Sequence, residues 1–238
     1  MGEGRVQLGA LEQADLAALA HEINNPLGAL CNSLCLLKSD LRLTGDNARL
    51  LEVAVEEASH LSQIVNDFLS YARFRHARLE RNDLNEQVSN ALFLMMRDER
   101  MKSGVEVVTE LARDLPPAQI DRNQLHEVVF NLVTNALDAL GGSGTLTIRT
   151  YNARLESAPA VGLLVEDSGA GIPAENKDKI FAPFFTTKQG GTGLGLSIVK
   201  RIVEDHHGVI SVESEQNHGT KVSVAIPISR EEAPWHRY

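Results

Sequence analysis

Two groups of residues, far apart in the chain, have the types and spacings needed for phosphate chemistry. Near the N-terminus, His21 is followed directly by Glu22, and Asn25 comes four positions after His21. A neutral imidazole is a nucleophile, because its unperturbed pKa is about 6.5, and an adjacent carboxylate can accept its proton during attack. In a helix, Asn25 would lie on the same face as His21, within reach of the same phosphoryl group or of a water molecule. A single histidine on a helix is more often a solvated surface residue, so this interpretation depends on the second group.

The second group centres on the glycine-rich stretch GGTGLGLS at residues 190–197, which precedes a helical pattern. Backbone N–H groups at such a helix start can bind phosphate. The spacing is not that of a P-loop. The preceding strand and the acidic residue of a dinucleotide-binding fingerprint are also missing. The stretch therefore indicates a phosphate site of another kind.

Two further motifs lie between these groups. Asn131 and Asn135 are four apart in an apolar helical pattern, where their amide oxygens could serve Mg²⁺, which prefers oxygen ligands. Asp167 follows a strand-like run and precedes Gly169 and Gly171, which suits a hydrogen bond to an adenine amino group. Taken alone, such a pair of asparagines is more often two ordinary surface amides, and many ordinary turns look like the aspartate with its glycines.

Apolar spacing predicts the elements that position these residues. Between Leu16 and Leu41 the apolar residues recur with alternating steps of four and three, as they do again between Leu51 and Ala72. Each run is typical of a helix with a packing seam, and the turn formers at 44–47 join the two into an antiparallel hairpin. A lone hairpin leaves an apolar face in water, so we expect two copies to form a four-helix bundle as a homodimer.

The remainder mixes both periods and predicts an α/β sandwich, which makes the chain α+β as a whole. The domains expected are a hairpin at 1–78, a linker at 79–84, an α/β domain at 85–230 and a tail at 231–238. Helices are predicted at 84–101, 122–140 and 194–207. Strands are predicted at Val105–Glu110, Thr145–Tyr151, Val161–Glu166, Val209–Ser214 and Lys221–Pro227.

Composition narrows the function classes. The 238 residues carry a formal net charge of -9, which disfavours a nucleic-acid partner. No apolar run reaches membrane-spanning length, and the first residues lack the core of a signal peptide. We therefore expect a cytoplasmic protein without a membrane span. Cys31 and Cys35, four apart in a helical pattern, are expected to pack rather than form a disulfide or bind metal.

Taken in order, these motifs resemble those of sensor histidine kinases. HEINNPL at 21–27 is similar to the H box, and the two asparagines to the N box. Asp167 with its glycines is similar to the G1 box, FAPFF at 181–185 to the F box, and the stretch at 190–197 to the G2 box. The resemblance covers residues 10–228 and implies the Bergerat (GHKL) ATPase fold, ATP and Mg²⁺ as ligands, and a response-regulator partner.

The resemblance also implies roles for individual residues. His21 would be the phosphoacceptor, Glu22 would assist proton transfer, and Asn25 would orient water when a partner is dephosphorylated. Asn131 and Asn135 would hold Mg²⁺. The implied nucleotide contacts are Asn131, Asn135, Asp167, Gly169, Gly171, Lys188, Gly191, Thr192, Gly193, Leu194, Gly195, Leu196 and Thr220. One position departs from the pattern, because Asp138 stands where many members have Lys or Arg. In this it resembles the nitrogen-regulation-type kinases.

The expected activity is ATP-dependent autophosphorylation of His21, making the chain a phosphoprotein, followed by phosphotransfer to a response-regulator aspartate. Two alternatives stay open. One is a protein that acts mainly as a phosphatase of its response regulator, through Glu22 and Asn25. The other is a non-catalytic module that binds nucleotide, dimerises and docks a partner.

Overall fold

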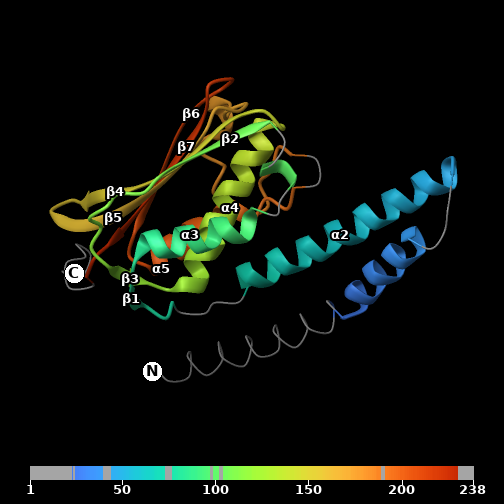
Figure 1. Ribbon diagram of the computed structural model, residues 1–238, viewed down its shortest axis with the longest axis horizontal. Coiled ribbons are helices and arrows are strands. Elements are labelled where there is room, and N and C mark those ends of the chain that lie inside the picture. The colour runs from blue at the N-terminus through green and yellow to red at the C-terminus, as the bar shows by residue number, and fades with distance from the viewer. Residues whose placement is uncertain are drawn as a thin grey trace. The chain divides into compact units, whose positions relative to one another are not determined.

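The computed structural model describes residues 23, 25–39, 44–72, 77–96, 99–101, 104–188 and 191–229. The chain divides into two compact units, with a boundary between Arg75 and His76. The first unit contains the helical hairpin and the segment Phe184–Leu194, and the second contains the α/β sandwich (Figure 1).

The hairpin consists of two helices around a turn at Gly45. The first helix is described over residues 25–39, and the second, α2, spans Asp46–Ala72. Gly45 has a φ of 64°, in the left-handed region that glycine adopts without steric cost. The Sγ of Cys31 lies 3.6 Å from Ser62 Oγ on α2, so the helices pack closely there. The two-helix prediction is confirmed, and both cysteines are free thiols.

Along the predicted seam of the hairpin, burial within one chain is incomplete. Ala58 is only 3% exposed, but other seam residues leave 38–48% of their surface in water. These are Ile23, Leu30, Leu37 and Leu61. The seam positions Leu16 and Ala20 lie outside the described residues. A single hairpin therefore cannot bury this apolar face.

The α/β unit is built on a five-stranded sheet with the order β2-β4-β5-β7-β6. Only the β2–β4 pair is parallel, and the other neighbours are antiparallel. The strands are β2 at Val105–Glu110, β4 at Gly144–Leu155, β5 at Ala158–Asp167, β6 at Val209–Glu215 and β7 at Gly219–Pro227. This mixed sheet confirms the predicted α/β sandwich, whose five principal strands all occur where the alternating pattern predicts them.

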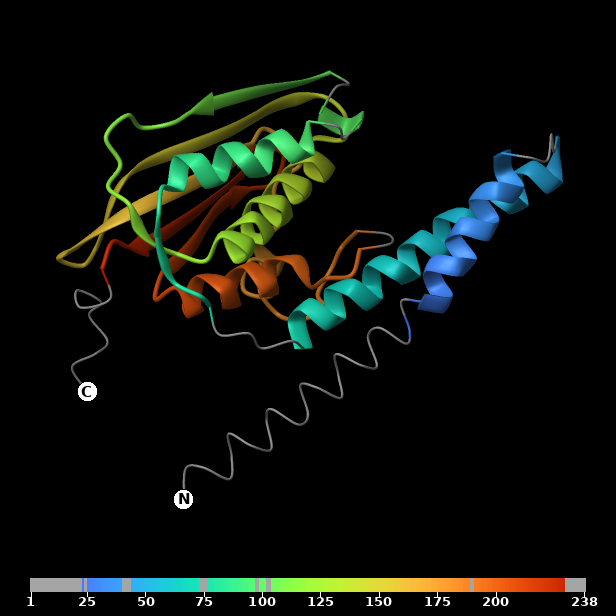
Figure 2. The ribbon, with the colours of Figure 1, turned by 60° about the horizontal axis from the view of Figure 1, so that its bottom comes forward.

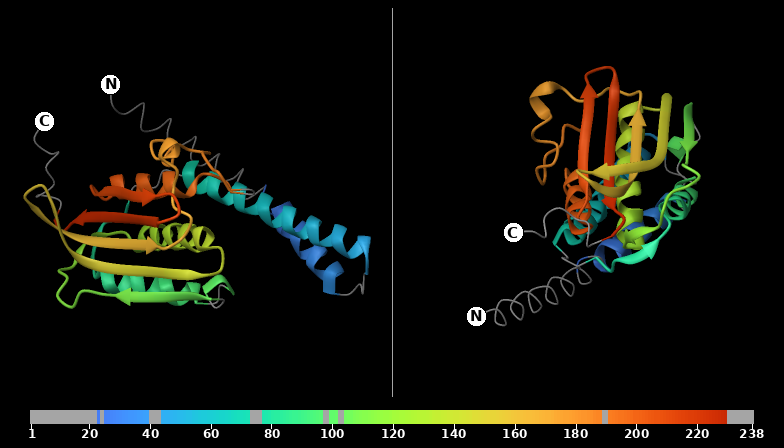
Figure 3. Two further views of the ribbon diagram at one scale, coloured as in Figure 1. Left: turned by 90° about the horizontal axis from the view of Figure 1, so that it is seen from above. Right: turned by 90° about the vertical axis from the view of Figure 1, so that its left-hand side faces the viewer.

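Three helices cover one face of this sheet, as Figures 2 and 3 show. They are α3 at Leu84–Met95, α4 at Arg122–Leu140 and α5 at Gly195–Asp205. In α4, buried residues such as Leu125, Val129 and Leu132 recur at helical spacing and form the core against the sheet. The helix begins where the Asp121 carboxylate accepts hydrogen bonds from Asn123 N and Gln124 N, and it ends at Gly141.

The structure differs from the predicted linker at 79–84. Glu80–Asn82 forms strand β1, which pairs antiparallel with β3 at Ala118–Ile120. The side chain of Asn82 is 4% exposed, and its Nδ2 donates to Ile120 O at 2.8 Å. These polar residues look like a linker in sequence, but pairing with a distant strand makes them part of the α/β unit.

The predicted helix at 84–101 is also shorter than expected. Helix α3 ends at Met95, and Glu99–Met101 forms a separate 3-10 turn, η1. A second such turn, η2, lies at Ala174–Asn176. Among the residues that the structure describes, no helix is both long and apolar enough to cross a membrane.

Candidate functional site

Asp167 lies at the end of the central strand β5 and is 6% exposed. Strand pairing places it opposite Thr220 on β7, and Thr220 lies opposite Ser214 on β6. The Oγ atoms of Ser214 and Thr220 are 2.9 Å apart, and Ser214 also donates to Gly219 O at 2.9 Å. A carboxylate and two hydroxyls from three neighbouring strands thus meet at one end of the sheet.

The loop after Asp167 is fastened to the end of α4. Asp167 Oδ1 accepts a hydrogen bond from Gly169 N at 2.9 Å, and Ala170 N donates to Ala139 O at 3.1 Å. A Cβ on Gly169 would lie 2.4 Å from Ala139 O, so only glycine fits there. The predicted nucleotide loop therefore rests directly on the helix that carries Asn131 and Asn135.

The turn between β6 and β7 approaches this loop equally closely. Gly171 has a φ of 64°, and a Cβ on it would lie 1.9 Å from Glu215 O. Gly219 has a φ of 91°, and a Cβ on it would lie 2.0 Å from Asp167 O. Neither backbone atom can move away without disturbing a strand end. The two glycines therefore fix how closely the loop and the turn approach each other.

Gly219→Ala should lower the free energy of unfolding of the α/β unit by about 2–5 kcal/mol. The left-handed backbone costs an L-residue about 1–2 kcal/mol, and overpacking adds about 1–3 kcal/mol. Urea denaturation followed by circular dichroism measures the change.

Gly142→Ala is the matched control, because Gly142 has a similar φ of 95° with no atom within 4 Å of its Cβ position. Gly142→Ala should lower the free energy of unfolding only by the cost of the left-handed backbone, about 1–2 kcal/mol. Equal losses in the two variants would show that the contact with Asp167 O does not constrain the loop.

Asn131, Asn135 and Gly195 lie together in the second unit. A Cβ on Gly195, the first residue of α5, would lie 2.9 Å from Asn131 Oδ1 and 3.7 Å from Asn135 Nδ2. The amide nitrogen of Asn131 donates to Glu127 O at 2.9 Å, which turns its oxygen toward the start of α5. Leu196 follows in the first turn of α5 and is half-buried. The helix start thus lies directly against both asparagines.

The remaining residues of the predicted nucleotide site lie in the segment Phe184–Leu194, which groups with the first unit. Within this segment, a Cβ on Gly193 would lie 2.5 Å from Phe184 C, and one on Gly191 would lie 2.6 Å from Thr186 Oγ1. Lys188 is exposed, and its backbone N–H donates to Thr186 Oγ1 at 3.1 Å. Thr192 Oγ1 accepts from Leu194 N at 3.4 Å. Within the described part of this segment, the chain therefore packs closely around Gly191 and Gly193.

His206 ties the end of α5 to the start of α4. Its ring is 2% exposed, Nδ1 lies 2.8 Å from Ile202 O, and Nε2 lies 3.0 Å from Asp121 N. Nδ1 must carry the proton, because Ile202 O only accepts, while Nε2 accepts from the Asp121 N–H. Burial lowers the pKa of His206 below its usual value, despite the opposing effects of the Ile202 carbonyl and the Asp121 and Asp205 carboxylates. A neutral ring thus links the two helices that carry Gly195 and the asparagines.

This lowered pKa predicts acid sensitivity. Below about pH 6.5 the unfolded chain binds a proton at His206 that the folded chain resists. The free energy of unfolding should therefore fall as the pH drops below about 6.5, until the folded-state pKa is passed. His206→Gln should make this dependence shallower, while lowering stability at pH 7 by about 1–2 kcal/mol through loss of hydrogen bonds.

Urea denaturation at pH values between 5 and 8 tests this, with His218→Gln as the control because His218 is exposed in a turn. The control should keep the wild-type pH dependence. A His206→Gln variant with an unchanged slope would contradict the prediction.

Of the predicted catalytic residues, the structure describes one. His21 and Glu22 lie outside the described residues, whereas Asn25 is an exposed residue of the first hairpin helix. Its exposure is compatible with an interaction at the hairpin surface.

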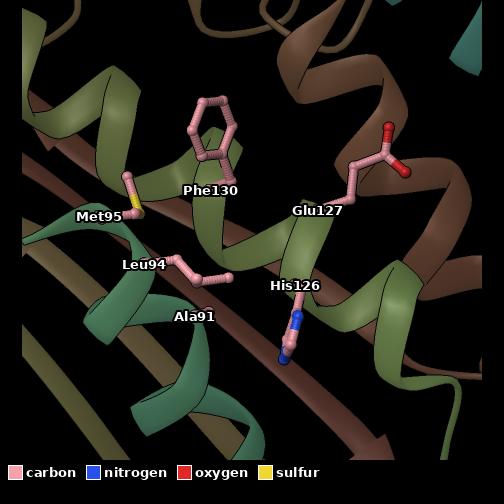
Figure 4. A pocket seen from close by; sticks show the side chains of 6 residues that line it. All are labelled: Ala91, Leu94, Met95, His126, Glu127 and Phe130. Carbon is pink, nitrogen blue, oxygen red and sulfur yellow. The ribbon is translucent and has the colours of Figure 1, made fainter. Parts of the chain in front are cut away.

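A separate hollow lies between α3 and α4 (Figure 4). It is lined by Ala91, Leu94, Met95, His126, Glu127 and Phe130. Leu94 and Phe130 are 67% and 53% exposed. No residue of the predicted nucleotide site lines it, so it is distinct from that site.

Two polar residues near the site were missed by the sequence interpretation. Ser214 lies beside Thr220 only because β6 and β7 pair in this register. The one feature of the sequence that could have indicated it was a polar residue in the strand that pairs with a predicted site residue. Its hydroxyl also accepts a hydrogen bond from Ile172 N at 2.8 Å. Arg100, which contacts α4 from η1, had no local sequence signal.

Comparison with known families assigns both halves of the chain. Residues 15–77 match the His Kinase A (phospho-acceptor) domain. Residues 120–230 match the histidine kinase-, DNA gyrase B-, and HSP90-like ATPase family. The first match includes His21, and the second includes α4 and the whole region from Asp167 to Thr220.

Individual relatives agree with this assignment. The sensor histidine kinase ZraS from Escherichia coli is 34% identical over 213 residues, covering 90% of this chain and 45% of ZraS. Sporulation kinase E from Bacillus subtilis is 31% identical over 212 residues, covering 89% of this chain and 28% of that kinase. The chain thus spans less than half the length of these relatives.

Solved structures give the same result. The catalytic domain of the histidine kinase ThkA is 35% identical with a TM-score of 0.58, covering 65% of this chain and 99% of that domain. ThkA in complex with the response regulator TrrA has a TM-score of 0.66 at 30% identity, covering 96% of this chain and 65% of ThkA. Full-length ShkA in complex with AMPPNP has a TM-score of 0.72 at 26% identity, covering 91% of this chain and 46% of ShkA. From its two domains, its fold and these relatives, the chain belongs to the sensor histidine kinases.

Proposed function

We propose that this chain transfers the γ-phosphoryl group of ATP to His21 and then to an aspartate of a response regulator. The observation that carries the proposal is the pairing of two sets of residues in the α/β unit. Asp167 and Thr220 meet at one end of the sheet, while Asn131, Asn135 and Gly195 meet where α5 begins. The first set is suited to bind the adenine base and the second to bind phosphates. The loop at Gly169 connects the two sets, because it packs against α4, the helix that carries both asparagines.

The adenine base of ATP would be bound mainly by Asp167. Its Oδ1 already accepts from Gly169 N, and a carboxylate with two oxygens retains capacity to accept from an adenine amino group. Thr220 adds a hydroxyl oxygen that can accept a hydrogen bond from the base directly or through water, while Ser214 holds that hydroxyl in place. Since guanine presents an oxygen in place of that amino group, this arrangement favours ATP over GTP.

The side-chain oxygens of Asn131 and Asn135 are suitable ligands for Mg²⁺. The amide oxygen of Asn131, which faces the start of α5, is the kind of ligand this ion takes, and Mg²⁺ commonly uses few protein ligands besides water and phosphates. Among the described residues, no three His, Cys, Asp or Glu side chains cluster to form a self-contained metal site. When bound, Mg²⁺ would neutralise charge that develops on the phosphates. The start of α5 would offer backbone N–H groups to the phosphates, and the side chain of Lys188 would offer a cation.

At His21, an imidazole nitrogen would form the new bond to phosphorus while the bond from phosphorus to the ADP oxygen breaks. The proton on the other imidazole nitrogen would pass to Glu22. Rate enhancement would come from positioning and from charge stabilisation rather than from further covalent chemistry.

The hairpin supplies the proposed assembly surfaces. Its apolar seam, with Ile23, Leu30 and Leu61 partly exposed in one chain, would be covered in a homodimeric four-helix bundle. The response regulator would dock on the surface around His21, within Leu16–Leu37 and Leu61–Ala72. The solved complex of ThkA with TrrA supports a partner of this class. We place this activity in the cytoplasm.

The deciding experiment is incubation of the chain with γ-labelled ATP and Mg²⁺, followed by treatment of the labelled protein with acid and with alkali. We expect a label that is lost in acid and kept in alkali, as a phosphoramidate bond requires. An acid-stable label would place the phosphate on another residue type and overturn the proposal. Nucleotide binding without any label would favour the phosphatase or the non-catalytic docking function.

A further inference from the structure

Asp138 places a negative charge on the face of α4 that carries the proposed phosphate-binding residues. Asn131, Asn135 and Asp138 are separated by four and then three residues, so their side chains share one face of the helix. On sequence alone, this carboxylate would repel a nucleotide triphosphate bound at that face.

The structure brings a cation to this position from another element. Arg100, in the 3-10 turn η1, places its Nη1 2.5 Å from Asp138 Oδ1. The two residues are 38 positions apart, so only the tertiary fold creates the pair. Their side chains are 43% and 32% exposed, which leaves the pair accessible from solvent.

The pair lies between the two halves of the proposed nucleotide site. Asp138 is one turn beyond Asn135 on α4, and its neighbour Ala139 accepts the hydrogen bond from Ala170 N in the loop after Asp167. A ligand extending from Asp167 to the asparagines would therefore pass close to Asp138, the residue to which Arg100 is bonded.

Guanidinium chemistry suits this position. Arginine carries five N–H donors in a planar fork, a geometry that can serve a carboxylate and a phosphate oxygen at the same time. Charge-assisted hydrogen bonds of this kind are stronger than those between neutral groups. The carboxylate would hold the fork in place, and the guanidinium would offset the carboxylate's charge toward the ligand.

We propose that Arg100 binds a phosphate group of the nucleotide and that Asp138 is its positioning residue. This inference rests on the proposed function, because it assumes that the α/β unit binds ATP. It adds a phosphate contact from η1, an element outside the motifs that predicted the site.

The test compares Arg100→Gln with wild type for binding of ATP and of adenosine, measured by calorimetry in the presence of Mg²⁺. We expect ATP affinity to fall about tenfold, while adenosine affinity stays within a factor of about two. Equal effects on both ligands, or no effect on either, would overturn the inference. Failure of wild type to bind either ligand would instead contradict the proposed function.

A control and a rescue separate phosphate binding from a structural role. Arg149→Gln breaks a similarly exposed arginine–carboxylate pair, with Glu110, and should leave ATP affinity unchanged. The double variant Arg100→Gln with Asp138→Arg places a guanidinium on α4 itself and should restore most of the lost ATP affinity. A second double variant, Arg100→Gln with Asp138→Asn, removes the carboxylate without adding a cation and should stay impaired. Restored ATP affinity in that variant would show that Arg100 only offsets the charge of Asp138, and it would overturn the inference.

Discussion

His21→Gln is expected to abolish phosphoprotein formation from γ-labelled ATP, reducing the label by at least about a thousandfold. Glutamine has a similar size, but its amide nitrogen is not nucleophilic and cannot form a phosphoramidate under these conditions. The loss should appear at the first time point and at saturating ATP, because the change removes the acceptor rather than substrate binding. Gel autoradiography of both proteins at equal concentration measures it.

Two controls make this result specific. The His21→Gln variant should bind ATP with wild-type affinity, since His21 is far in sequence from the region 120–230 that matches the ATPase family. His218→Gln, at an exposed histidine in the turn between β6 and β7, should label normally. Label retained in His21→Gln would assign the phosphate to a different side chain and remove the basis of the proposed reaction.

Asp167→Asn is expected to weaken ATP binding about 10- to 100-fold and to lower autophosphorylation at limiting ATP by the same factor. Asparagine keeps an oxygen for the hydrogen bond from Gly169 N, so the loop can retain its shape. The other carboxylate oxygen becomes an amide donor and meets the adenine amino group, which is also a donor. Losing a charged hydrogen bond and leaving a buried donor unsatisfied costs about 1.5–3 kcal/mol.

The neighbouring residue provides the matched control. Glu166 precedes Asp167 on β5 but is exposed, so Glu166→Gln should bind ATP normally. The ratio of ATP to GTP affinity gives a second readout, because an amide donor at 167 can bond to the guanine oxygen. Wild-type discrimination between ATP and GTP in the Asp167→Asn variant would show that Asp167 does not contact the base.

Local patterns predicted most of the elements. The helix predicted at 122–140 has the bounds of α4, and the strand predicted at Val105–Glu110 has those of β2. Such agreement is expected where apolar periodicity, caps and turn formers act within a few residues. The turn glycine at 45 is a signal of this local kind.

Contacts between distant residues were invisible to those patterns. The segment 79–84 had the composition of a linker, yet β1 is fixed by pairing with β3 nearly forty residues later. His206 is an unremarkable histidine in sequence, and only the approach of α5 to α4 gives its ring two backbone partners. Neither feature has a periodic or compositional signature.

The sequence by itself therefore determined which residues could do chemistry and which elements carry them. Residue type and short-range spacing fix a nucleophilic imidazole, a glycine-rich helix start and an acidic strand end. Only the tertiary structure decided which of them meet. Strand register places Asp167 opposite Thr220, and helix packing brings Gly195 against Asn131. The position of η1 brings Arg100 into contact with Asp138. These juxtapositions depend on how whole elements pack into one core, and the free energy of that packing is shared among residues across the entire α/β unit.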